Sequence, residues 1–160
     1  MAVDMFIKIE GIPGESKDKD HEGEIDVLQW NWGASQSGTM HLGGGGGAGK
    51  VNVQDLTFVK YCDKATTNLF KNVCNGRHIP EATLYVRKAG ENALEYLVIT
   101  MEDLLVSSIT NGAQSSDERL TECVTLNFAK VSIKYTPQRA DGSPEGSLEA
   151  GWNMEENTEW

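Results

Sequence analysis

Positively charged residues are few in this 160-residue sequence. It contains 14 Lys and Arg residues against 24 Asp and Glu residues, so its formal net charge is −10 at pH 7. A surface of this charge repels the phosphate backbone of nucleic acids and is not attracted to anionic membranes. The composition therefore argues against nucleic acid and against a membrane surface as partners.

Long apolar runs are also missing. Asp4 and Lys8 interrupt the apolar residues near the N-terminus, so the segment lacks the apolar core of a signal peptide. No stretch approaches the roughly 20 apolar residues that a membrane-spanning helix needs. We expect a protein without membrane insertion that is made and folded in the cytoplasm. If it leaves the cell, it must do so without a cleaved signal peptide.

The residues that commonly carry chemistry lack the spacing that catalysis or metal binding requires. The three cysteines are an odd number without a Cys-x-x-Cys pair, so we expect buried, reduced thiols. His21, His41 and His78 have no metal-ligand spacing to another His or to Cys, and we expect them in loops or interfaces. We therefore predict no catalytic residue, no metal site and no cofactor, in a protein that is not an enzyme.

Two motifs resemble ligand-binding loops but fail in their context. Gly44 to Lys50 follows most of the phosphate-loop pattern, but the next residue is Val51 instead of Ser or Thr, and it begins a strand pattern. The segment 18–23 begins like a calcium loop, but Gln29 stands where the bidentate acid is needed. We expect a solvated acidic loop at 18–23. At 38–50 we expect a flexible loop that approaches another backbone closely, because glycine removes side-chain bulk.

Short alternating patterns of apolar and polar residues fill most of the chain and predict β-strands. The longest runs from about Leu120 to Tyr135, and its apolar face changes phase near Ala129 and Lys130. That change predicts a β-bulge or a bend, which would re-aim the side chains that follow. Other strands are expected at 3–9, 25–32, 51–59, 84–98 (a hairpin with its turn at 89–92) and 104–108.

One helix is expected, with apolar residues at helical spacing from Ala65 to Val73. Asp63, Thr66 or Thr67 can cap its start, and Asn75-Gly76 can end it. The fold class predicted from these elements is mainly β: a two-sheet antiparallel β-barrel over 1–140, with one flanking α-helix and a long glycine-rich loop. Residues 141–160 contain six acidic and no basic residues, which predicts a loose acidic C-terminal tail.

Two tryptophans, Trp30 and Trp32, lie on one face of a predicted strand. Large aromatic side chains dominate cores and interfaces, and a pair of them can also form a sugar-binding platform. A monomeric secreted binding module, lectin-like in character, therefore remains open as an alternative function.

Several segments together carry a recognisable pattern: 1–9, 14–18, 24–28, Trp30-x-Trp32-Gly33, 37–41 leading into the glycine loop, 50–56, and 120–122 through 127–128. In combination they resemble the haemolysin co-regulated protein (Hcp) family. The resemblance covers nearly the whole chain, and only the region after about Asp141 is weakly diagnostic.

The resemblance implies the tube protein of a type VI secretion system. Members of the family are two-sheet β-barrels with one flanking helix that assemble as hexameric rings. The rings stack into a tube, inside a contractile sheath and under a spike, and contraction ejects the tube with small effectors in its lumen. The expected partners are then further copies of this chain, sheath and spike proteins, and small effector proteins. The expected location is extracellular, after assembly in the cytoplasm.

Two groups of residues are the expected contact sites. The glycine loop is expected to dock onto an adjacent subunit or ring through Gly38, Gly43, Gly44, Gly45, Gly46, Gly47, Gly49 and Lys50. The segment 111–116 has only small or uncharged polar side chains, and in a ring of this family such a loop can reach the lumen. Unless it is an ordinary solvent loop, we expect it to contact effectors through Asn111, Gln114, Ser115 and Ser116.

Overall fold

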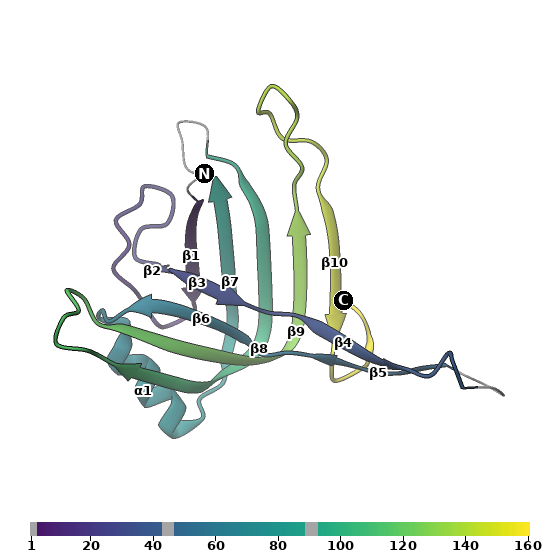
Figure 1. Ribbon diagram of the computed structural model, residues 1–160, viewed down its shortest axis with the longest axis horizontal. Helices are drawn as coiled ribbons and strands as arrows, with labels where there is room; N and C mark the ends of the chain where they lie inside the picture. Colours follow the sequence, from purple (N-terminus) through teal and green to yellow (C-terminus); the bar gives the residue numbers. More distant parts are fainter. Residues whose placement is uncertain (1–2, 43–46, 89–92) are drawn as a thin grey trace.

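The computed structural model describes residues 3–42, 47–88 and 93–160 (Figure 1). Within these residues it has eleven strands and one helix, so the predicted mainly β fold with one helix is confirmed. In chain order the elements are β1 (Val3–Ile9), β2 (Ile25–Asp26), β3 (Gln29–Asn31), β4 (Ala34–Gly38), β5 (Ala48–Val53), β6 (Leu56–Tyr61), α1 (Ala65–Asn75), β7 (Ile79–Lys88), β8 (Glu95–Gly112), β9 (Thr121–Tyr135), β10 (Leu148–Asn153) and β11 (Thr158–Glu159).

Nine strands form one antiparallel sheet, and β4 and β5 form a separate two-stranded ribbon. The order along the sheet is β11-β10-β9-β8-β7-β1-β2, and β6 joins β3 to β9. The first part of β9 pairs with β6 and its last part pairs with β10, while β8 accompanies it on the other side. The sheet thus has two regions, one around β3 and β6 and the other around β7 and β10. Figure 1 shows that the strands of these two regions run in different directions. The two long strands β8 and β9 therefore continue from one region into the other.

The strand pairing does not confirm the predicted barrel. The segment 25–31 is divided into β2, which pairs with β1, and β3, which pairs with β6. Between them the backbone changes partner within one step: Val27 N donates to Met5 O at 2.9 Å and Leu28 N donates to Val59 O at 2.8 Å. The chain turns a corner here, so β2 and β3 are two short strands with different partners and not one continuous edge.

The phase change predicted in the longest strand is present. Leu126 and Phe128 are buried, and the next buried side chain is Val131. The pairing register of β8 with β9 does not shift at residues 128–131 of β9. A register shift, which marks a bulge or irregularity, lies instead between Val106 and Ser108 of β8. The change at 129–130 is therefore a bend, placed where β9 leaves β6 and begins to pair with β10. Opposite the bend, Asp103 of β8 has a φ of 52°, in the left-handed region that few side chains adopt.

The predicted helix is confirmed as α1, and it ends at Gly76 as predicted, while its N-cap position is Lys64, whose side chain makes no capping hydrogen bond. Asp63 Oδ1 accepts a hydrogen bond from Ala65 N at 2.9 Å. Gly76 ends the helix with a φ of 61°, and its N–H donates to Asn72 O at 3.0 Å. Leu69 is fully buried on the inner face of the helix. In the described part of the chain, no helix is both long and apolar enough to span a membrane.

The burial expected for the cysteines is wrong for one of them. Cys74 is exposed near the end of α1, while Cys62 and Cys123 are partly buried. Burial is the largest influence on the Cys62 thiol and, together with the neighbouring Glu122 carboxylate, it raises the pKa of this thiol. A raised pKa leaves less of the reactive thiolate at neutral pH, so Cys62 is suited to packing and not to nucleophilic chemistry.

The expectation of a loose tail is wrong for residues 148–153. They form β10, which pairs with β9 and carries β11 on its other edge. Apolar residues meet across this pairing: Ala150 lies opposite Ile133 and Trp152 lies opposite Val131. Such cross-strand apolar pairs stabilise a sheet, which is why an acidic segment nevertheless becomes a strand.

Candidate functional site

The β4–β5 ribbon leaves the main body of the molecule and projects from one end of it (Figure 1). Every residue of β4 is exposed. The pairing is antiparallel from Ala34↔Val53 to Gln36↔Val51, with an irregularity before Gly38. Near the tip, Thr39 N and Thr39 Oγ1 both donate to Gly47 O, at 3.3 and 2.9 Å. The ribbon is thus a hydrogen-bonded arm that has no second layer packed on β4.

The glycine loop predicted as a docking element belongs to this arm in part. Gly38, Gly47, Gly49 and Lys50 lie on the ribbon, and Gly43, Gly44, Gly45 and Gly46 lie outside the described residues. At Gly49 the two strands of the ribbon lie close together, while docking onto an adjacent subunit stays a prediction. A Cβ atom there would lie 2.4 Å from Ser37 Oγ and 3.2 Å from Ser37 O. At Gly38 an added Cβ would meet nothing within 4 Å, so that position does not require glycine for space.

Two apolar side chains near the tip were missed by the sequence analysis. Met40 is 81% exposed and Leu42 is 57% exposed. They flank His41, which is also exposed, in a segment otherwise made of glycine and small polar residues. The sequence did hold a signal, since two apolar residues stand in a segment of glycine and small polar residues. An exposed apolar cluster of this kind indicates a contact surface.

An apolar groove of about 500 Å³ lies between the base of the ribbon and the sheet. Trp32, Val51 and Val53 line it on the ribbon side, and Val131, Ile133 and Trp152 line it on the side of β9 and β10. Within the described residues, the indole Nε1 atoms of Trp32 and Trp152 have no hydrogen-bond partner. The groove therefore has mainly apolar walls, and the two indole nitrogens are buried within them.

The two tryptophans considered as a sugar platform do not form an exposed surface together. Both Trp30 and Trp32 are partly buried and pack against the core. Trp30 lies opposite Phe58 in the β3–β6 pairing, while Trp32 lines the groove. The lectin-like alternative thus lacks the open stacking face that it requires.

The residues expected to contact effectors lie at the other end of the molecule. Asn111 is in the last part of β8, and Gln114, Ser115 and Ser116 follow in the loop to β9; all four are exposed. A turn fixes the loop, since Gln114 N donates to Asp117 Oδ2 at 2.8 Å. Figure 1 places this loop and the ribbon at opposite ends of the longest axis. The structure therefore keeps the two predicted contact regions apart.

A buried ion pair behind this loop was also missed. Lys60 is 0% exposed and Glu122 is 2% exposed, and the Lys60 ammonium contacts the Glu122 carboxylate and, at 2.9 Å, Asp63 Oδ1. Thr66 Oγ1 donates to Glu122 Oε1 at 2.6 Å, and Asn111 Nδ2 donates to Glu122 Oε2 at 3.4 Å. The pair thereby joins β6, the start of α1, β9 and the end of β8.

Hydrogen bonding decides the charge state of Glu122. Burial alone would raise the pKa of this carboxyl, but the hydrogen bonds from Lys60 and Thr66 outweigh it and leave the pKa below its usual value. The sequence did hold a signal for the pair. Lys60 continues the alternation of Leu56 and Phe58 on the buried face of β6.

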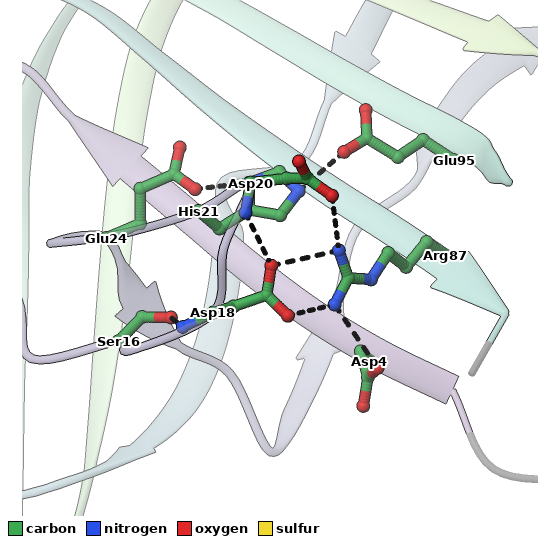
Figure 2. Close-up of polar contacts among 8 residues, drawn as sticks. All are labelled: Asp4, Ser16, Asp18, Asp20, His21, Glu24, Arg87 and Glu95. Atoms are coloured by element: carbon green, nitrogen blue, oxygen red, sulfur yellow. Dashed lines mark hydrogen bonds and ion pairs between the residues drawn. The ribbon is translucent and has the colours of Figure 1, made fainter. Parts of the chain in front are cut away.

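A second polar cluster holds the segment between β1 and β2 against the sheet (Figure 2). Arg87 of β7 is 7% exposed, and its guanidinium binds both oxygens of Asp18, with Nη1 and Oδ1 at 3.0 Å. Asp4 and Asp20 approach the same guanidinium at 3.6 Å. The hydrogen bond from Arg87 lowers the pKa of Asp18. A carboxyl with a lowered folded-state pKa adds stability at neutral pH and loses it as the pH falls through that pKa.

His21 lies at the centre of this cluster and is 4% exposed. Its ring stacks on Phe6 with centroids 4.4 Å apart, and it contacts the Tyr85 ring at 4.7 Å. Nδ1 faces Glu24, and Nε2 lies 2.5 Å from Glu95 Oε1. His21 lies in a loop, as expected. The expectation of a solvated acidic loop at 18–23 is wrong for Asp18 and His21, which pair with Arg87, Glu24 and Glu95, while Asp20 and Glu22 are exposed.

Neither cluster has the composition of a metal centre. Among residues 3–42, 47–88 and 93–160, no group of three or more His, Cys, Asp or Glu side chains is arranged to hold a metal ion. The exposed arm and its apolar groove suit contact between macromolecules instead.

Comparison with known proteins gives one consistent match. Residues 6–135 match the family model described as "Type VI secretion system effector, Hcp". The chain is 59% identical over 161 residues to the hcp1 protein of Pseudomonas aeruginosa, covering 99% of each sequence. The crystal structure of Hcp1 from Salmonella typhimurium is similar with a TM-score of 0.84 and 42% identity, covering 100% of both chains. A structure described as a type six secretion system protein has a TM-score of 0.94 and 28% identity, covering 99% of this chain and 100% of that one.

Proposed function

This chain belongs to the Hcp family of type VI secretion system proteins, and we propose that it is a structural subunit of the secretion tube. In this proposal six copies form a ring, rings stack into a tube, and sheath contraction ejects the tube under its spike. The role is one of assembly and not of catalysis.

The observation that carries the proposal is that a single subunit exposes both an arm with apolar side chains and an apolar groove. Near its tip the arm carries two exposed apolar side chains, Met40 and Leu42. An exposed apolar cluster of this kind indicates a contact surface. The same chain holds an apolar groove of about 500 Å³. An arm and a groove on one chain are different patches, and contact between different patches of identical subunits generates rings or filaments.

The mass in solution tests the ring directly. Light scattering of the purified protein is expected to give six times the subunit mass of 17.5 kDa. Electron micrographs viewed down the ring axis should show rings with a central opening. A monomer at all protein concentrations would contradict the proposal.

We also propose that the exposed residues Asn111, Gln114, Ser115 and Ser116 line the lumen and contact effector proteins. Their amide and hydroxyl groups donate and accept hydrogen bonds without imposing one sign of charge. The loop is fully exposed in the subunit, which leaves these groups available to a partner. Contacts of this kind suit a reversible grip on several different effectors.

Replacing Gln114 with Trp, or Ser115 with Arg, is expected to reduce the secretion of a co-expressed effector. A bulky or charged side chain in the loop would block the uncharged polar contacts, while the ring and export of the tube protein persist. The measurement is immunoblotting of effector and tube protein in culture supernatants. Unchanged effector levels in both variants would place the effector contacts elsewhere.

A further inference from the structure

The outer face of α1 is positively charged on a chain that is otherwise strongly acidic. The segment 64–78 contains two lysines and one arginine but no acidic residue, while the whole chain has a net charge of −10. Exposed side chains follow one another along the helix at intervals of three and four residues, which places them on one side of it. We call this side the basic helix face, and its members are Lys64, Thr67, Phe70, Lys71 and Cys74.

The stability of the helix does not explain this charge. Lys64 is the N-cap residue, its side chain makes no capping hydrogen bond, and the first turn contains no acidic residue. A cation is unfavourable there, because the helix dipole is positive at the N-terminus. The nearby Glu15 carboxylate accepts a hydrogen bond from the Lys64 backbone N–H at 3.0 Å, and no carboxylate of the described residues forms an ion pair with the ammonium of Lys64 or Lys71.

Phe70 adds an apolar centre to the basic helix face. Its side chain is 62% exposed, and Lys71 follows it directly. An aromatic side chain bordered by polar and charged ones is the usual composition of a protein contact surface. The face therefore suits a partner that offers both negative charge and an apolar side chain.

The end of the same chain offers both. Residues 141–160 contain six acidic residues and no basic one. We call the exposed residues after β10 the acidic edge: Glu155 and Glu156 in the turn, Glu159 in β11, and Trp160, which is 42% exposed. Within the part of the chain that the structure describes, none of these three glutamates forms an ion pair.

The two surfaces lie too far apart to meet within one molecule. Figure 1 shows α1 on one side of the main body, and β10 with the C-terminus on the opposite side. Two copies placed side by side can bring the basic helix face of one against the acidic edge of the other. Contact between two different patches of identical subunits closes into a ring when the rotation between neighbours allows it.

We propose that the basic helix face of each subunit binds the acidic edge of the next and that this contact closes the ring; the inference rests on the proposed tube function. The two lysines pair with the glutamates of the neighbouring copy, and Phe70 packs against its Trp160. Opposite charges speed the encounter and fix the orientation of the two copies, and the aromatic pair adds apolar contact. The arm stays free for contact between rings.

Two charge-reversed variants and their mixture test the contact. Lys64→Glu with Lys71→Glu makes both surfaces negative, and Glu155→Lys with Glu156→Lys and Glu159→Lys makes both positive. Each variant alone should repel its own copies, so light scattering should show the mass fall from six subunits to one subunit of 17.5 kDa. In an equal mixture each surface meets the opposite charge, so rings of alternating variants should form. Native mass spectrometry, with one variant labelled with nitrogen-15, should then show three copies of each.

The mixture also controls for misfolding, because only folded chains can close a ring. Lys134→Glu with Arg139→Glu makes the same change of charge as the lysine variant at exposed positions outside both surfaces, and its mass should stay that of six subunits. Hexamers of either charge-reversed variant alone would overturn this contact and leave the tube proposal intact. A mixture that stays monomeric would show that the two surfaces are not partners. A monomeric unmodified protein would overturn both this contact and the tube proposal.

Discussion

Replacing Glu122 with alanine is expected to lower the free energy of unfolding by about 3–5 kcal/mol, because it leaves a buried ammonium without its main partner. Lys60 is 0% exposed, so water cannot take the place of the lost carboxylate. Asp63 remains 2.9 Å from the Lys60 ammonium and offsets part of the loss. Thr66 and Asn111 also lose their acceptor. Urea unfolding followed by circular dichroism, at a fixed protein concentration, measures the change.

A double replacement separates the buried charge from the loss of side-chain volume. Lys60→Met with Glu122→Leu removes both charges and keeps apolar volume, so its stability should lie much closer to that of the unmodified protein. Glu149→Ala removes an exposed glutamate of β10 and should change the free energy of unfolding by less than about 0.5 kcal/mol. If Glu122→Ala were no more destabilising than Glu149→Ala, the pair would not be buried as described.

Replacing Met40 and Leu42 together with aspartate is expected to abolish stacking of rings and to reduce export of the tube protein by at least about tenfold. Burying one such side chain contributes about 1.5–3 kcal/mol, and every subunit of a ring contributes two of them. The aspartates would in addition bring negative charge to a chain whose net charge is already −10. Sedimentation and electron microscopy measure stacking, and immunoblots of culture supernatants measure export.

The matched control exchanges the same two residues. Met40→Leu with Leu42→Met keeps both side chains apolar and nearly unchanged in volume, so stacking and export should persist. Both variants should fold, because the two positions are 81% and 57% exposed and lie outside the core. Stacked tubes and full export in the aspartate variant would show that the tip of the arm is not a contact surface.

Elements whose signals are local were predictable from the sequence. The apolar spacing of the helix, the Asp63 carboxylate before it and the glycine that ends it all lie between Asp63 and Gly76, and α1 has these features. The strand 3–9 and the hairpin flanking 89–92 follow from alternation in the same way, and the structure has β1, β7 and β8 there. The place of β10 was not predictable, because its support comes from apolar residues of β9 that the chain brings opposite to it.

The polar clusters show the same division between local and distant information. The phase of Lys60 relative to Phe58 can be read locally, but its partner Glu122 is 62 positions away. The burial of His21 could not be predicted, because Glu95 and Arg87, which pair with its segment, come from distant strands. A run of acidic residues predicts a solvated loop from composition alone, because composition does not show which cationic side chains the fold places beside them.

The continuity of β8 and β9 has a mechanical consequence. A hinge between the two regions of the subunit would need a flexible connection, but here the connection is a hydrogen-bonded ladder that runs from Leu97↔Tyr135 to Gly112↔Thr121. Bending one region against the other would have to break ladder bonds on both sides of Asp103 at once. The two regions of the subunit therefore form one stiff body, and the arm projects outside it.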